Sequence, residues 1–146
     1  MMRALMSSVV AQDTLRVLVV DDEESIRGFA ERALRGAGYE VVVAPDGPEA
    51  LWLVEAQPRP FDLFVVDVLM PQMCGDELGR QLRQRDADVK VLYFTGYIDR
   101  LFEDRQTLWE HEAFIEKPVT VTGLLEAVSL LLFGHTHGPA GRSSAA

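Results

Sequence analysis

Five short apolar runs lie along the chain, and each has the length of a strand. They cover residues 16–20, 39–44, 61–66, 89–94 and 113–115. Runs that are apolar at nearly every position are typical of strands buried on both faces, as in a parallel sheet. The third run delivers a single carboxylate, Asp67, and the chain then breaks at Pro71. The pattern predicts five buried strands.

Between these runs the apolar residues recur at helical spacing. The spacing predicts helices over about 25–37, 48–57, 76–84, 99–109 and 120–133. Strand and helix therefore alternate five times, which indicates an α/β fold with a parallel sheet and helices on both faces. Right-handed crossovers leave few topologies, and the flavodoxin-like strand order 2-1-3-4-5 is one of them.

The chain of 146 residues is long enough for one domain with its own core. We expect this domain to span residues 15–133. Residues 1–14 are expected to form a flexible N-terminal leader, and residues 134–146, rich in Gly, Ser, Ala and His, a disordered C-terminal tail.

Charge and cysteine content narrow the functional classes. The formal net charge is −9, which argues against nucleic acid as the main partner because phosphate binding needs a basic patch. No apolar stretch reaches the length of a membrane-spanning helix. The single cysteine, Cys74, excludes an internal disulfide and allows a reducing compartment, so we expect a cytoplasmic protein.

Polar side chains follow four of the predicted strands. Asp21 and Asp22 come after the first, Asp67 after the third, Thr95 after the fourth and Lys117 after the fifth. In the order 2-1-3-4-5 the first and third strands are neighbours, which brings the three carboxylates to one edge of the sheet. Crowded carboxylates raise one another's pKa unless a cation lies among them. We interpret the cluster as a site for Mg²⁺ (or Mn²⁺), which prefers oxygen ligands.

The segments around these residues resemble one known family. The matching segments are Val20-Asp21-Asp22-Glu23, Val66-Asp67-Val68-Leu69-Met70-Pro71, Phe94-Thr95-Gly96 and Lys117-Pro118. They occur in order, at predicted strand ends, over roughly residues 15–133. Together they resemble the receiver domain of two-component response regulators.

The resemblance implies a role for each acidic residue. Asp67 would accept a phosphoryl group from a histidine kinase, a phosphotransfer protein or a small phosphodonor. Asp22, Asp67 and the backbone carbonyl of Leu69 would bind Mg²⁺. Asp21 would act mainly through a water on the metal.

The resemblance also implies roles around the phosphoryl group. Thr95 and Lys117 would contact the phosphoryl group, and Phe114 would be the switch aromatic that turns inward when Thr95 moves. The Lys117-Pro118 bond is typically cis in this family. Leu69 and Tyr97 would flank the path of the hydrolytic water and slow hydrolysis.

The implied function is a signalling switch rather than a metabolic enzyme. The domain would catalyse its own phosphorylation and dephosphorylation, and would control an unknown downstream protein. The last helix, 120–133, is apolar beyond the usual arc, which fits either a well-buried terminal helix or an exposed apolar strip. An exposed strip would serve docking of a partner, or a homodimer through the fourth helix, the fifth strand and the last helix. No output domain is evident after residue 133. The chain is therefore either a stand-alone regulator or a receiver from a larger protein such as a hybrid histidine kinase.

Three other functions would use a similar set of residues. A phosphatase of the haloacid-dehalogenase-like group would need an aspartate two residues after the nucleophile, where this chain has Leu69. A dinucleotide-binding domain would need glycines after the first strand, where Asp21 and Asp22 would repel a pyrophosphate. A pseudo-receiver that binds partners without phosphorylation stays open as the alternative, although the intact acidic set, Thr95 and Lys117 argue against it.

Overall fold

The computed structural model describes residues 14–56, 59–96 and 111–134. The expected leader (except residue 14), the helix predicted over 99–109, Tyr97 and all but residue 134 of the expected tail lie outside the described residues.

One parallel sheet organises the molecule. Its strands are β1 (Arg16–Val20), β2 (Glu40–Ala44), β3 (Leu63–Val66), β4 (Val91–Thr95) and β5 (Glu112–Glu116), in the order β2-β1-β3-β4-β5. The predicted fold class and strand order are therefore confirmed. The register pairs Val20 with both Ala44 and Val66, so that three neighbouring strands end level with one another.

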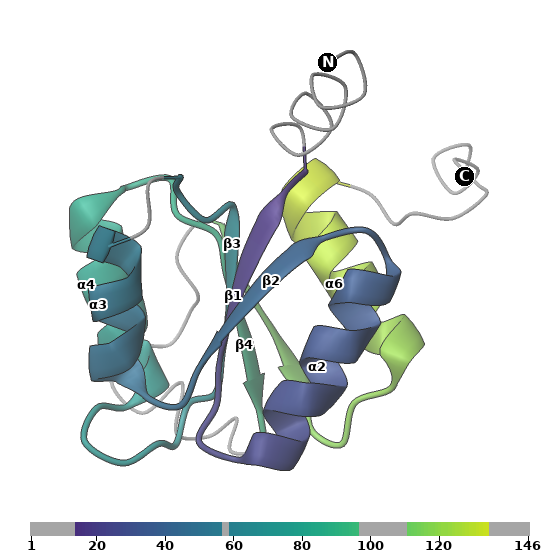
Figure 1. Ribbon diagram of the computed structural model, residues 1–146, viewed down its shortest axis with the longest axis horizontal. Helices are drawn as coiled ribbons and strands as arrows, with labels where there is room; N and C mark the ends of the chain where they lie inside the picture. Colours follow the sequence, from purple (N-terminus) through teal and green to yellow (C-terminus); the bar gives the residue numbers. More distant parts are fainter. Residues whose placement is uncertain (1–13, 57–58, 97–110, 135–146) are drawn as a thin grey trace, which may run out of the picture.

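Within the described residues, four helices cover this sheet, and Figure 1 shows that they lie on both of its faces. The helices α3 (Gly47–Ala56) and α4 (Gly75–Arg85) pack on one face, and α2 (Glu24–Gly36) and α6 (Val121–Phe133) pack on the other. Two apolar clusters result, one under each helix pair. Because both faces are covered, every residue of β1, β3 and β4 is buried, which accounts for their continuous apolar runs.

Local hydrogen bonds set the ends of several elements. The Thr120 side chain accepts a hydrogen bond from the N–H of Gly123 at 2.9 Å, so Thr120 caps α6 rather than forming its first residue. Gly134 ends the same helix in the left-handed conformation, with φ 81°. At the start of β3, the Asp62 carboxylate accepts from the N–H of Arg16 at 2.7 Å, and the strand begins one residue later, at Leu63. None of the described helices is long and apolar enough to cross a membrane.

Candidate functional site

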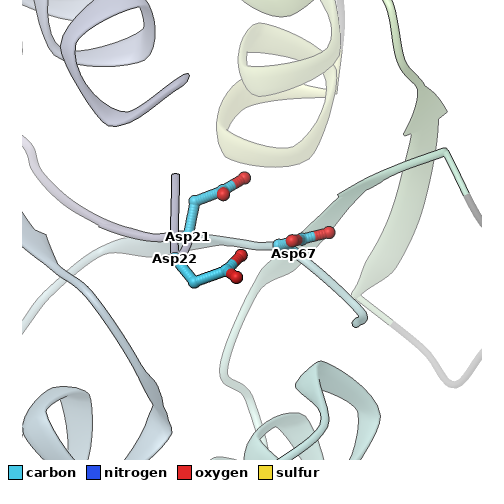
Figure 2. A group of neighbouring side chains, drawn as sticks. All are labelled: Asp21, Asp22 and Asp67. Carbon is cyan, nitrogen blue, oxygen red and sulfur yellow. The ribbon is translucent and has the colours of Figure 1, made fainter. Parts of the chain in front are cut away.

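Two adjacent strands deliver the acidic cluster. Asp21 directly follows β1 and Asp67 directly follows β3, and the N–H of Asp67 donates to the carbonyl of Val20 at 2.9 Å. Carboxylate oxygens of Asp21, Asp22 and Asp67 all lie within 4.8 Å of one another, and Figure 2 shows the three side chains gathered at this edge. Asp21 and Asp67 are 1% and 5% exposed, whereas Asp22 faces solvent. The structure therefore brings together the three carboxylates that the sequence predicts.

Lys117 reaches this cluster from the end of the edge strand β5. Its backbone N–H donates to the carbonyl of Thr95 at 2.9 Å, which holds the end of β5 against the end of β4. Its Nζ lies 2.9 Å from Oδ2 of Asp21, 3.6 Å from Oδ1 of Asp67 and 3.9 Å from Oε1 of Glu23. The Lys117-Pro118 peptide bond is cis. One ammonium thus faces three carboxylates from two other segments.

The electrostatic balance leaves Asp67 difficult to ionise. Burial is the largest cause that raises the pKa of Asp67 to about 7, and the charges of Asp21 and Asp22 raise it further, while Lys117 opposes them. Burial alone would lower the pKa of Lys117. The hydrogen bond to Asp21 and the surrounding carboxylates outweigh burial, so the pKa of Lys117 is raised. The ammonium stays charged, yet it does not fully compensate the carboxylates.

This donor set fits a hard divalent cation. The three carboxylates that lie within reach of one another supply oxygen ligands only, and oxygen is the donor that Mg²⁺ selects. The exposure of Asp22 leaves one side of the cluster open to water, which suits an ion that keeps part of its hydration shell. A cation here would also relieve the repulsion that raises the pKa of Asp67.

The other predicted site residues that the structure describes lie around the same edge or further along β5. Thr95 is fully buried at the end of β4, and Leu69, in the loop after β3, is 38% exposed. Phe114 is 40% exposed in the middle of β5, where it pairs with Tyr93 in register, two residues before the pair of Thr95 and Glu116. Phe114 therefore stands outside the core in this structure.

The structure adds two residues that the sequence did not point to. Gly75 packs so closely against Asp67 that a Cβ at this position would lie 2.0 Å from the Asp67 carbonyl oxygen. Its N–H donates to the carbonyl of Val68 at 2.7 Å, which closes the loop after β3. Arg27 of α2 donates from Nη1 to the carbonyl of Asp21 at 2.8 Å. In the sequence, Gly75 could have been suspected only as a glycine four residues after Pro71. Nothing in the sequence distinguishes Arg27 from any other arginine on a helix.

Comparison with known proteins gives a consistent result. A family model described as response regulator receiver domain matches residues 17–129. Sensor kinase CckA of Brucella abortus is 35% identical over 116 residues, which is 80% of this chain and 12% of the kinase. The response regulator receiver protein CpdR of the same organism is 29% identical over 117 residues, 80% of this chain and 96% of CpdR. The chain thus spans nearly all of one relative and a small part of the other.

Solved structures resemble the fold over the same region. The receiver domain of the hybrid histidine kinase CckA has a TM-score of 0.68 and 34% identity, covering 80% of this chain and 98% of that domain. The response regulator TrrA of Thermotoga maritima, in complex with Mg²⁺ and BeF, has a TM-score of 0.72 and 32% identity. That match covers 82% of this chain and 100% of TrrA.

Proposed function

Because the chain belongs to the response regulator receiver domain family, we propose that it is a switch that accepts a phosphoryl group on Asp67. The proposal rests on one observation above all. Asp67 is a nearly buried carboxylate that has both carboxylate neighbours, Asp21 and Asp22, and an ammonium, Lys117, within reach. Carboxylates serve as nucleophiles in phosphoryl transfer when the charge around the transferring group is offset.

In the proposed reaction an oxygen of Asp67 attacks the phosphorus of a phosphohistidine or of a small acyl phosphate. The new bond joins this oxygen to phosphorus, and the bond from phosphorus to the donor nitrogen or oxygen breaks, with its electron pair leaving on the donor. The Lys117 ammonium would pair with one phosphoryl oxygen and the Thr95 hydroxyl would donate to another. Both side chains come from strand ends, so they are held by the sheet before the donor arrives.

Asp22, Asp67 and the backbone carbonyl of Leu69 would hold Mg²⁺ or Mn²⁺, with Asp21 acting mainly through a water on the ion. When bound, the ion would supply positive charge against the transferring phosphoryl group. The complex of TrrA with Mg²⁺ and BeF supports, by similarity, the presence of a Mg²⁺ site in this chain. Thr95 and Lys117 would then be the residues that contact the phosphoryl group without holding the ion.

The proposed switch follows from the placement of Thr95 and Phe114. When the Thr95 hydroxyl moves toward a phosphoryl group, Phe114 would turn from its present half-exposed position into the space that Thr95 vacates. The surface of β5 and α6 would then differ between the two states, and a partner that prefers one state would shift the equilibrium.

The proposed partners are a histidine kinase or a phosphotransfer protein upstream, and an unidentified protein downstream. The likeness to both a sensor kinase segment and the short regulator CpdR supports either a part of a hybrid kinase or a separate regulator acting by protein contact. Because histidine kinases draw on cytoplasmic ATP, the proposed switch operates in the cytoplasm. The proposed unit covers residues 15–133, with residues 1–14 as a leader and 134–146 as a tail.

Intact mass after incubation with Mg²⁺ and acetyl phosphate tests this function. Wild type should gain one phosphoryl group, and Asp67→Asn should gain none. Asp46→Asn is the matched control, since Asp46 caps α3 through an oxygen that asparagine retains. If wild type gained nothing from acetyl phosphate or from a panel of histidine kinases while it still bound Mg²⁺, the pseudo-receiver alternative would replace the proposal.

A further inference from the structure

Phe94 occupies the last position of β4 before Thr95, so one strand end delivers both a hydroxyl and an aromatic ring to this edge of the sheet. The Phe94 side chain is 2% exposed and belongs to the apolar cluster under α2 and α6. Close packing on that face fixes the ring in place. The ring is therefore a rigid part of the site rather than a mobile surface group.

The ring lies against the ammonium of Lys117. Lys117 Nζ is 5.2 Å from the centroid of the Phe94 ring, within the distance of about 6 Å at which a cation is attracted by an aromatic face. The same ammonium is 2.9 Å from Asp21 and 3.6 Å from Asp67. Its side chain is 18% exposed, so water has limited access to it. Both the low exposure and the short distance favour a significant interaction with the ring.

We propose that Phe94 is a positioning residue: its aromatic ring face holds the Lys117 ammonium beside Asp67 and thereby sets the rate of phosphoryl transfer. The inference rests on the proposed function for its effect on rate, and on the contact itself for its geometry. An aliphatic side chain such as leucine would fill much of the same volume but would offer the ammonium no negative face.

The Phe94 ring contributes both packing and attraction for the Lys117 ammonium, and these two contributions can be measured separately. Phe94→Leu removes both ring packing and the ring's attraction for the cation. Stepwise fluorination keeps the shape of the ring nearly constant and withdraws negative charge from its face. Replacing Phe94 by mono-, di- and trifluorophenylalanine therefore tests the attraction alone.

Phe64 of β3 is the matched control position. It is 4% exposed and lies in the cluster on the other face of the sheet, where its ring makes an edge contact with Phe61. The same fluorinated series at position 64 should change packing to a similar extent without facing Lys117. Phe64→Leu is in the same way the packing control for Phe94→Leu.

The readout is the rate constant for phosphorylation by acetyl phosphate at saturating Mg²⁺. Phe94→Leu should lower it by about 2- to 30-fold, the range that corresponds to cation–aromatic energies, and the rate should fall stepwise with each added fluorine. The series at position 64 should stay flat. A flat series at position 94 in a protein whose wild type is phosphorylated would overturn the inference and leave the proposed function intact.

A second readout does not depend on phosphorylation. The ring should shift the proton resonances of the Lys117 ε-methylene group upfield, and Phe94→Leu should abolish that shift while Phe64→Leu retains it. Equal Lys117 shifts in wild type and Phe94→Leu would overturn the inference even if the wild type proved inactive toward every donor.

Discussion

The nucleophile proposed here is costly to keep charged. Asp67 is buried beside two further carboxylates, and its pKa is raised to about 7 in spite of the Lys117 ammonium nearby. Such a site stores unfavourable electrostatic free energy that a cation or a change in charge at Asp67 can release. The same arrangement that makes the carboxylate reactive toward phosphorus therefore destabilises the fold when the site carries no cation.

The stability of the metal-free protein should fall with rising pH because of Asp67. Its pKa is about 7 in the folded chain and 3.8 ordinarily, so between these values the folded state binds more protons than the unfolded state. The contribution is therefore fully present below about pH 4 and lost as the pH rises through 7. In EDTA, Asp67→Asn should match wild type near pH 4 and exceed it by about 1 kcal/mol or more at pH 8.

Urea unfolding of both proteins at the two pH values measures this difference. Mg²⁺ at pH 8 should raise the stability of wild type more than that of Asp67→Asn, because a ligand stabilises the state that binds it. Equal stability of the two proteins at pH 8 in EDTA would contradict the raised pKa.

Leu69 is expected to slow loss of the phosphoryl group. It lies two residues after Asp67 and is 38% exposed, where its apolar side chain would obstruct an incoming water. Leu69→Asn should raise the dephosphorylation rate severalfold, measured by loss of the phosphorylated mass. Trp52→Asn, which also replaces an apolar residue by asparagine, lies at a 63% exposed position on α3 and should leave the rate unchanged. Equal rates for Leu69→Asn and wild type would refute the role.

The position of some site residues could be predicted from the sequence, and that of others could not. Asp21, Asp67 and Lys117 follow apolar runs, and parallel strands end at a common edge, so their meeting could be predicted from order alone. Phe94 was predicted as a strand residue, but its contact with Lys117 depends on side-chain direction, which a continuous apolar run does not reveal. The hydrogen bond from Arg27 to the Asp21 carbonyl depends on the path of the turn before α2.

The turn between β3 and α4 connects the proposed nucleophile to the rest of the fold. α4 begins at Gly75, whose N–H donates to the carbonyl of Val68 at 2.7 Å. The same residue packs directly against the Asp67 carbonyl, where a Cβ would not fit, so the turn requires a glycine at this position.

Gly75→Ala should destabilise the protein by about 1 to 3 kcal/mol and weaken Mg²⁺ binding, because the new Cβ would force the Asp67 backbone to move. Gly36→Ala is the control: Gly36 lies in α2, its Cβ would meet nothing within 4 Å, and alanine should stabilise the helix by about 0.5 to 1 kcal/mol. Thermal unfolding with and without Mg²⁺ compares the two. A neutral Gly75→Ala would show that the turn tolerates a side chain.

The elements themselves could largely be predicted, and their ends less well. Apolar runs identified the five strands of the described residues, most clearly β1, β3 and β4, which the helices on both faces bury completely. β5 extends from Glu112 to Glu116 rather than over 113–115, since ladder hydrogen bonds to β4 recruit polar residues that no apolar pattern marks. β4 begins at Val91 rather than at residue 89, because the N–H of Val89 bonds to the carbonyl of Asp86 in a turn.

The exposed surface of α6 and β5 bears on whether the molecule self-associates. Leu130 and Phe133 on α6 and Phe114 on β5 are each between 40% and 51% exposed. Apolar side chains on such elements favour contact with a second copy or a partner. We propose that phosphorylation promotes a homodimer through this region and the preceding, fourth predicted helix.

Sedimentation velocity at high micromolar concentration, with and without Mg²⁺ and beryllofluoride, tests the dimer. The beryllofluoride form should sediment as a dimer, and Leu130→Glu should shift it to the monomer. Trp52→Glu, on the exposed side of α3, should leave the dimer intact. A monomer in both states would remove self-association from the proposal and leave a heterologous partner.

The phosphoryl group itself can be located by chemistry. Borohydride reduces an aspartyl phosphate to homoserine, so wild type incubated with Mg²⁺ and acetyl phosphate, then reduced and digested, should yield homoserine at position 67 alone. Homoserine at Asp21, at Asp22 or at no position, in a protein that has gained the mass of a phosphoryl group, would contradict the assignment of Asp67 as the acceptor.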